Sequence, residues 1–447
     1  MKKLDDIDLS VEFAGVKMRS PLGVAAQAPF APASISGDRL AEILLKHVDA
    51  GAGYIHTPYT NVELHHPKNK LPTGRFLKAH TPGFGRSGFW VAADSYRIEM
   101  RKEESLKMVK FLKTRLPSDV PIIANIMGPG ADPEGWANLA KEFEDAGADI
   151  IELDVSCPLP ATAAGAVESF VSAERIPEHA GMLLGDNPAL TIAVTTAVVK
   201  KTRLPVGVKL TPETGFPRLI GLVEQLKEVG AKFITSVNAP LSVAPPDIYN
   251  FGKSPYPGLS ANTISPVVGP WTRYLCYRNV GTISMFVPGI DQAAVGGLVD
   301  VSHSVEAMML GAKICEFSSG TLWKGWSFIT DSLNFLKKYM HKYGYESLEE
   351  FRGLGVQYIK PADEIDWGLG KLAAKIDQTK CKGCGICANN LCWAIKMNDD
   401  NKATVLEKDC GACALCIAIC PSDAIELGDA EFPLTEEEIY EQYPKMG

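Results

Sequence analysis

The sequence lacks any apolar run near the roughly 18 residues that cross a bilayer, so we expect no membrane-spanning segment. It also lacks an excess of positive charge, because 45 lysines and arginines face 53 aspartates and glutamates, giving a net charge of -8. Nucleic acids and anionic membranes attract a basic face, so neither is an expected partner. No apolar segment follows the lysines near the N-terminus, which argues against a secretory signal and predicts a cytoplasmic location.

Cysteine is scarce over most of the chain and concentrated near its C-terminal end. Of the 11 cysteines, 8 lie between positions 381 and 420. Disulfide frameworks are typical of small secreted chains, whereas this chain has 447 residues, 46% of them hydrophobic, and can bury a full core. The composition therefore predicts one large domain and a smaller domain that binds metal.

Between residues 20 and 345, short β-rich runs alternate with amphipathic helical stretches, a pattern typical of repeated βα units and a parallel sheet. Eight such runs predict a (β/α)8 barrel of the TIM type, since eight parallel strands in a chain of this length favour closure over an open doubly wound sheet. The predicted strands are 21 to 26, 53 to 57, 121 to 127, 149 to 156, 205 to 210, 232 to 238, 292 to 296 and 313 to 318.

The domain boundaries follow from the same reading. We expect the barrel over residues 1–345, a helix and linker over 346–372, the cysteine domain over 373–430 and a tail over 431–447. Two connections, 58 to 100 and 159 to 187, are too long for plain barrel loops and predict lids over the face where the strands end. That face carries the chemistry in TIM barrels.

The cysteine domain has the spacing of a ferredoxin with two 4Fe-4S clusters. Its first motif is C-x2-C-x2-C followed by a fourth cysteine, and its second is C-x2-C-x2-C-x3-C-P. In such domains the fourth ligand of each cluster comes from the other motif. We therefore predict one cluster on Cys381, Cys384, Cys387 and Cys420, and the other on Cys410, Cys413, Cys416 and Cys392.

One position departs from this pattern, and one alternative stays open. Cys392 follows Cys387 after four residues rather than three, and Trp393 stands where proline is usual. Two structural zinc sites are the alternative, because paired cysteines two residues apart also hold zinc. The x2-x2-x3-Pro run favours the clusters.

The chain as a whole resembles the flavin-containing part of dihydropyrimidine dehydrogenase, including its bacterial iron-sulfur subunit. The resemblance lies in the opening DLSVEFAGVKMRSPLGVAAQAP, in ELDVSCP, VKLTP, SVNA and VGGL, and in the cysteine domain that follows. It covers nearly the whole chain in order. It implies a barrel of the dihydroorotate dehydrogenase type that binds FMN, fed with electrons by the clusters.

The resemblance assigns a set of FMN contacts at the ends of the strands. The turns after strands seven and eight match the family's grip on the FMN phosphate, where small residues and free N-H groups are suited to an anion. Lys209 matches the lysine that contacts the flavin, and a cation there stabilises the reduced ring. The expected cofactor-binding residues are Ala25, Ala26, Asn125, Lys209, Asn238, Gly296, Gly297, Ser319 and Gly320.

Cys157, directly after strand four, matches the family's general-acid cysteine. Reduction of a polarised C=C bond needs a hydride on one carbon and a proton on its neighbour. A thiol with an ordinary pKa of about 8.5 is mostly protonated at neutral pH and can donate that proton. Cys276 and Cys315 are interpreted as buried and inert.

Several positions depart from the family pattern in the region that binds the pyrimidine. Asp154 replaces an asparagine, Ala239 a threonine, and the family's lysine after strand two appears as His56-Thr57-Pro58. Residues 89–93 are apolar where amide-binding groups are usual. We therefore keep Asp154, Ser156, Ala239 and His56 as candidate substrate contacts, with Glu168, Glu174 and His179 of the long connection as further polar candidates.

The predicted function is an oxidoreductase that reduces, or forms, a C=C bond conjugated to a carbonyl in a small cyclic substrate. Neither domain offers a nicotinamide site, so the electron donor is expected to be a separate subunit with FAD and NAD(P)H, or a ferredoxin, in a homo- or hetero-oligomer. Two alternatives remain: an electron-transfer subunit with no substrate of its own, and a dihydroorotate dehydrogenase with a fused ferredoxin.

Overall fold

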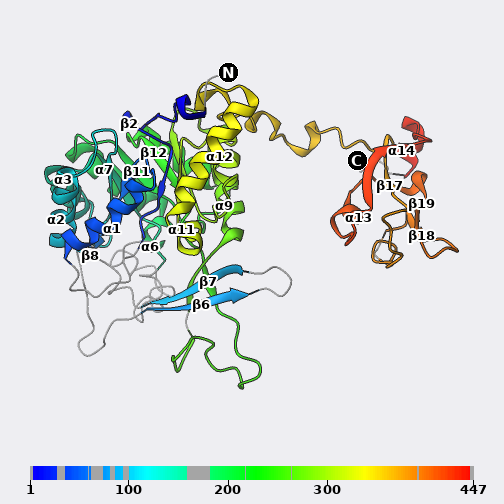
Figure 1. Cartoon of the computed structure of the whole chain (residues 1–447), viewed down its shortest axis with the longest axis horizontal. Helices are drawn as coiled ribbons and strands as arrows, with labels where there is room; N and C mark the ends of the chain where they lie inside the picture. Colours follow the sequence, from blue (N-terminus) through cyan, green and yellow to red (C-terminus); the bar gives the residue numbers. More distant parts are fainter. Residues whose placement is uncertain are drawn as a thin grey trace. The chain divides into compact units, whose positions relative to one another are not determined.

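The chain forms two compact units, residues 1–359 and residues 360–447, each described here by itself. The structure is a computed structural model, shown in Figure 1. It describes residues 4–27, 36–58, 60–61, 74–80, 86–93, 100–158, 182–216, 218–262, 264–389 and 392–442.

The first unit is an eight-stranded parallel barrel (Figure 1). Its strands are β3 (Leu22–Val24), β4 (Ile55–His56), β9 (Ile122–Met127), β10 (Ile150–Asp154), β11 (Val206–Lys209), β12 (Phe233–Ser236), β15 (Asp291–Val295) and β16 (Ile314–Phe317). Seven of them lie within one of the eight predicted runs, and β15 begins one residue before its predicted run of 292 to 296. The barrel nearly closes, because β16 pairs with β3 in parallel and Gly53 N, just before β4, donates to Leu22 O at 2.9 Å. These contacts confirm the predicted barrel over the open sheet.

Helices cover the outside of the barrel because each has one apolar face. They are α1 (Gly37–Asp49), α2 (Lys102–Lys113), α3 (Pro133–Ala146), α6 (Met182–Gly185), α7 (Pro188–Lys201), α8 (Arg218–Glu228), α9 (Arg273–Phe286), α10 (His303–Met309), α11 (Ser319–Lys324) and α12 (Ser327–Tyr343). Helix α3 is typical. Asp132 caps its start by accepting from Glu134 N, and Gly147 ends it at a φ of 105°.

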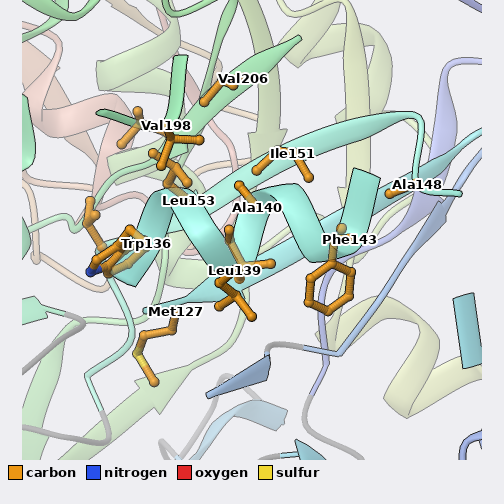
Figure 2. Close-up of a cluster of buried hydrophobic side chains, with 14 of the residues drawn as sticks. Met127, Trp136, Leu139, Ala140, Phe143, Ala148, Ile151, Leu153, Val198 and Val206 are labelled. Atoms are coloured by element: carbon orange, nitrogen blue, oxygen red, sulfur yellow. The ribbon is translucent and has the colours of Figure 1, made fainter. Parts of the chain in front are cut away.

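Figure 2 shows how α3 packs on the sheet. Trp136, Leu139, Ala140 and Phe143 point from the helix toward the strands, and all four are at most 2% exposed. They belong to one continuous cluster that includes residues of β9, β10, β11 and α7. This apolar shell between sheet and helices leaves the inside of the barrel to other side chains.

Additional strands extend the barrel. β1 (Val11–Phe13) and β2 (Val16–Met18) form a hairpin, while β5 (Thr60–Asn61) and β8 (Met100–Arg101) pair with each other and β5 with β9. The predicted lid over 58 to 100 contains β6 (Gly74–His80) and β7 (Arg86–Ala93), which form an antiparallel sheet with β13 (Leu241–Val243) and β14 (Ile264–Val268). Short 3-10 turns lie at Leu4–Asp6, Pro270–Thr272, Leu348–Glu350 and Val356–Tyr358.

Residues 346–359, expected within the linker, pack in the first unit. Leu348 and Phe351 are buried in its core, and the amides of Gly353 and Gly355 donate to Met308 O and Met309 O. The second unit begins at Lys360.

The second unit is built from short elements around a small core. Its strands form two antiparallel pairs, β17 (Leu372–Ile376) with β20 (Ile425–Asp429) and β18 (Ile395–Met397) with β19 (Ala403–Val405). The unit also contains the 3-10 turns Ala362–Glu364 and Glu407–Asp409 and the short helices α13 (Leu415–Ala418) and α14 (Glu436–Gln442). Among the described residues of the chain, no helix is both long enough and apolar enough to cross a bilayer.

Candidate active site and cluster sites

The ends of strands β10 and β11 bring a buried cation beside a buried carboxylate. Asp154 and Lys209 are register partners at these ends, and they are 2% and 3% exposed. Burial alone would lower the pKa of Lys209, but the nearby acidic groups, first Glu152 and then Asp154, outweigh it and raise that pKa. Lys209 therefore stays charged inside the barrel.

A hydrogen-bonded chain of side chains links strands β10 and β12. Ser156 donates to Asp154 Oδ1 from its amide at 3.1 Å and from its hydroxyl at 2.8 Å. Asn238 Nδ2 donates to Ser156 Oγ at 3.1 Å, and Asn238 Oδ1 accepts from Ala239 N at 2.8 Å. Cys157 is the residue directly after Ser156 and is 4% exposed. These hydrogen bonds fix the backbone from which the Cys157 thiol extends.

Asn125, on β9, has one amide atom engaged and one available. Its Nδ2 donates to Glu152 Oε1 at 2.7 Å, and its backbone amide donates to Thr57 Oγ1 at 3.0 Å. Its Oδ1 is buried without a hydrogen-bond partner among the described residues. A buried acceptor of this kind is suited to a donor on a bound molecule.

The turns after β15 and β16 are adjacent because these strands pair. Gly296 and Gly297 have φ values of 106° and 70°, and a Cβ on Gly297 would lie 2.4 Å from Arg273 N. A Cβ on Gly320 would lie 2.4 Å from the Phe328 ring. Only glycine fits these positions without a shift of the neighbouring atoms, and turns of small residues after the last two strands are where barrels of this type bind phosphate. The residues present therefore fit an FMN phosphate.

Small residues end the first strand, beside these turns. Ala25 is 5% exposed, and its amide donates to Phe317 O at 3.0 Å. Ala26 is half-buried, and Ser319, at the start of α11, is 4% exposed. Apart from Asn125, which lies within β9, the expected cofactor residues lie at the carboxyl ends of strands or in the segments that follow, which is where a barrel binds its ligand.

His56 lies inside the barrel between two glutamates that the sequence analysis missed. Its Nε2 is 3.3 Å from Glu152 Oε1 and 3.7 Å from Glu316 Oε1, and all three side chains are 0% exposed. Strand alternation was the available signal, because Glu152 precedes Asp154 by two residues and Glu316 lies in the middle of its predicted strand. That His56 contacts substrate remains a prediction.

The cysteines of the second unit line two cavities. One is bordered by Cys381, Cys384, Cys387 and Cys420 together with Pro421. The other is bordered by Cys392, Cys410, Cys413 and Cys416, with Cys387 at its edge. Each predicted set of four cysteines thus surrounds one cavity, including Cys392 despite its longer spacing.

Two thiols in these cavities accept hydrogen bonds from backbone amides. Ala374 N lies 3.4 Å from Cys410 Sγ, and Ala424 N lies 3.4 Å from Cys420 Sγ. Burial and the neighbouring cysteines raise the pKa of Cys416. A metal binds such cysteines as thiolates, and the donor set fits iron as well as zinc. Residues Glu168, Glu174 and His179 lie outside the described residues.

The barrel has glycine turns after its last two strands, where TIM barrels frequently bind phosphate, and a buried lysine at the end of the fifth strand. The family model for dihydroorotate dehydrogenase matches residues 9–340. The chain belongs to the dihydroorotate dehydrogenase family, and it is a flavin-dependent oxidoreductase of the dihydropyrimidine and dihydroorotate dehydrogenase type.

The chain is also similar to individual proteins over most of its length. The chain is 27% identical over 446 residues to the NAD-dependent dihydropyrimidine dehydrogenase subunit PreA of Escherichia coli, covering 96% of this chain and 98% of that protein. It is 24% identical to the catalytic subunit of dihydroorotate dehydrogenase B from Thermococcus kodakarensis, and 27% identical to that from Pyrococcus abyssi, each over 78% of this chain and 98% and 99% of the relative.

Proposed function

We propose that the chain exchanges a hydride and a proton with a C=C bond conjugated to a carbonyl in a small cyclic substrate, using FMN in the barrel and two 4Fe-4S clusters in the second unit. One observation carries the proposal. The paired strands β10 and β11 bring the charged Lys209 next to the segment that ends in Cys157. A cation for the flavin and an acid for the substrate then share one site.

The chain's own residues have separate roles toward the cofactor. FMN, when bound, supplies hydride transfer and one-electron exchange with the clusters. The backbone of Gly296, Gly297, Ser319 and Gly320 would hold its phosphate, and the small side chains of Ala25 and Ala26 leave room beside the strand. Lys209 supplies the positive charge that favours electron uptake, and the Asn125 and Asn238 amides offer hydrogen bonds.

Cys157 supplies the proton. In the reducing direction one alkene carbon gains a hydride, the neighbouring carbon gains the thiol proton, and the thiolate left on Cys157 recovers a proton from water. In the oxidising direction the thiolate removes that proton. The hydrogen bonds among Asp154, Ser156 and Asn238 hold the segment at a fixed distance from Lys209, and proximity of this kind is a large part of the rate.

We propose a conjugated cyclic carbonyl compound as the substrate class, contacted by Asp154, Ser156, Ala239 and His56. A pyrimidine is the first candidate because PreA is named a dihydropyrimidine dehydrogenase subunit. Dihydroorotate is the second, because the archaeal relatives are named dihydroorotate dehydrogenase catalytic subunits. The carboxylate of Asp154 can accept hydrogen bonds but not donate them, so it favours a substrate with an N-H or O-H group at that point.

PreA is named a subunit, and this supports a separate electron partner for the present chain. We propose an FAD subunit that oxidises NAD(P)H, or a ferredoxin, delivering single electrons through the clusters. If the donor is an FAD subunit, the complex is a hetero-oligomer. If the donor is a ferredoxin, the chain itself forms a homo-oligomer.

Anaerobic purification with counts of iron, sulfide and flavin tests the cofactors. About eight irons and one FMN per chain are expected. The dithionite-reduced protein is then titrated with uracil, thymine and a panel of cyclic enones, and the oxidised protein with dihydroorotate, while the visible spectrum is recorded. Reoxidation by one compound class supports the enzyme. Zinc in place of iron, an absence of flavin, or no response to any compound contradicts the proposal.

A further inference from the structure

Three ionisable side chains from three strands meet inside the barrel. His56 comes from β4, Glu152 from β10 and Glu316 from β16, and one nitrogen or oxygen atom of each lies within 4.8 Å of the others. All three side chains are fully buried. We call these residues the barrel triad.

The two carboxylates of the barrel triad differ in their partners. Glu152 accepts from Asn125 Nδ2 at 2.7 Å and from Thr235 Oγ1 at 2.5 Å. Neither oxygen of Glu316 has a hydrogen-bond partner among the described residues. A buried carboxylate that accepts hydrogen bonds tolerates its charge, whereas one without them favours the neutral acid. If one of the two carboxyl groups of the triad is protonated, it is therefore that of Glu316.

The charges around the barrel triad lead to the same assignment. The other titratable groups that interact with it are Tyr54, Asp154, Lys209, Cys276 and Cys315, and Cys157 in turn acts on Lys209. Burial raises the pKa values of Tyr54, Cys276 and Cys315, so these stay neutral. Protonated His56 and Lys209 then balance Glu152 and Asp154, and the interior is neutral only if Glu316 keeps its proton.

We propose that Glu316 is a neutral carboxylic acid in the barrel interior and serves as a proton reserve that responds to charge at the Lys209 end of the site. Burial, together with the nearby Glu152 carboxylate, raises the pKa of Glu316 to about 7 against the opposing effect of His56. Glu316 thus titrates near neutral pH, where a change of nearby charge has the largest effect on the fraction of Glu316 that is protonated.

The consequence for the reaction rests on the proposed flavin function. Two electrons delivered by a low-potential donor add negative charge beside Lys209, which increases the proton affinity of Glu316. Above neutral pH its carboxylate then takes up as much as one proton from water for each two electrons, and it returns that proton on reoxidation. Glu316 is a positioning residue, since it acts through charge rather than by touching the reacting atoms.

Infrared spectroscopy on the whole chain tests the protonation state and requires no bound flavin. At pH 6 the wild type should show a protonated-carboxyl stretching band that Glu316→Gln removes and that fades as the pH rises to 9. Glu349→Gln, at an exposed glutamate, is the control and should leave the band unchanged. A wild type without the band, or a band that survives Glu316→Gln, overturns the proposal.

Metal analysis of the same samples tests the competing occupant, since a histidine and two carboxylates also bind divalent cations. One equivalent of zinc or manganese, lost in both Glu316→Gln and His56→Gln, overturns the proton reserve. We expect no such metal.

Potentiometric titration of the bound flavin tests the coupling. One additional proton per two electrons changes the reduction equilibrium tenfold per pH unit, about 30 mV. The potential of the wild type should fall more steeply than that of Glu316→Gln above about pH 7, by up to this amount. Equal slopes overturn the coupling, while a chain that binds no flavin fails the proposed function and leaves the infrared result to decide the protonation of Glu316.

Discussion

The two units of the chain differ in what fills their centres. The barrel unit has two large clusters of buried residues, one including Trp136 and Phe143 and the other Phe13 and Phe317. Among the described residues of the second unit, the cluster has seven buried members, including Cys387 and Cys416. So small a core contributes little stability by packing. The comparison indicates that the barrel folds on its own side chains and the cysteine unit around its metal.

Each unit also brings several acidic groups together in its interior, but the two units offset the negative charge of these groups in different ways. The barrel places Glu152, Asp154 and Glu316 near Lys209 and His56, so it can balance charge with its own cations and one proton. The second unit gathers cysteines around two cavities, where burial and the neighbouring cysteines raise the pKa of Cys416. Bound metal ions would offset the charge of the ionised thiols. The barrel is therefore expected to tolerate loss of its cofactor far better than the second unit.

The largest expected effect is loss of the clusters. Cys416→Ser, or chelation of the metal, should remove the compact structure of residues 360–447, because structural metals contribute folding free energy directly. Hydrogen exchange on the full chain should then show the second unit unprotected and the barrel unchanged. Cys276→Ser, at a buried barrel cysteine whose thiol donates to Ser236 O, is the control. Continued protection of residues 372–376 and 425–429 after metal loss would break the comparison.

The next largest effect concerns the reaction. Cys157→Ser should lower the turnover number by about 100- to 10,000-fold, the usual contribution of a general acid, because a hydroxyl is a much weaker acid than a thiol. Flavin content and the rate of dithionite reduction should not change, since the thiol acts on the substrate. Steady-state rates with the active compound measure this. A variant as active as Cys276→Ser would remove Cys157 from the mechanism.

The fold was predictable from the sequence because each barrel strand is a short β-rich run between amphipathic helices. The helix ends were also marked, as at Gly147, which takes the left-handed conformation that ends α3. Residues 346–359 were less predictable. Their contacts with α10 depend on Leu348 and Phe351 reaching a distant part of the core, which no local pattern records.

The site was predictable where a motif fixes it and less so where residues meet across the barrel. The cysteine spacing led to two groups of four that surround two cavities. The barrel triad has no motif, because His56, Glu152 and Glu316 lie on three separate strands and only the closed barrel brings them together. Glu152 and Glu316, each within a strand of mostly apolar residues, were a further sign, beside Lys209 and Asp154, that the interior is charged.

A smaller effect is expected at the phosphate turn, where two glycines offer a matched pair. Gly297 and Gly325 have φ values of 70° and 75°, but a Cβ on Gly297 would lie 2.4 Å from Arg273 N, whereas a Cβ on Gly325 meets nothing within 4 Å. Both alanine variants should lose about 1 kcal/mol of stability from backbone strain, and Gly297→Ala should lose more because its Cβ would overlap backbone atoms. Only Gly297→Ala should also weaken FMN binding, by about tenfold, which corresponds to about 1.4 kcal/mol. Equal FMN dissociation constants in the two variants would remove this turn from the cofactor site.

The last expected effect is the pH dependence that Glu316 gives to the stability of the barrel. Its pKa is about 7 in the folded protein and about 4.5 as the ordinary value, so the folded state holds the proton more tightly. Stability from this group is fully present below about pH 4.5 and is lost as the pH rises through 7. Glu316→Gln does not titrate, so its stability relative to wild type should increase between pH 5 and pH 8, by up to about 2.5 kcal/mol.

Urea unfolding followed by far-UV circular dichroism at these two pH values measures that difference, since most of the described helices belong to the barrel unit. Glu349→Gln should track the wild type at both. Glu152→Gln sharpens the comparison, because the pKa of Glu152 is lowered to about 2 and its ionised form already has two hydrogen-bond donors. Its loss should destabilise the barrel at both pH values rather than relieve it at the higher one. If Glu316→Gln and Glu152→Gln behaved alike, the barrel interior would not distinguish its two carboxylates, and the contrast between a self-neutralised barrel and a metal-neutralised cysteine unit would lose its basis.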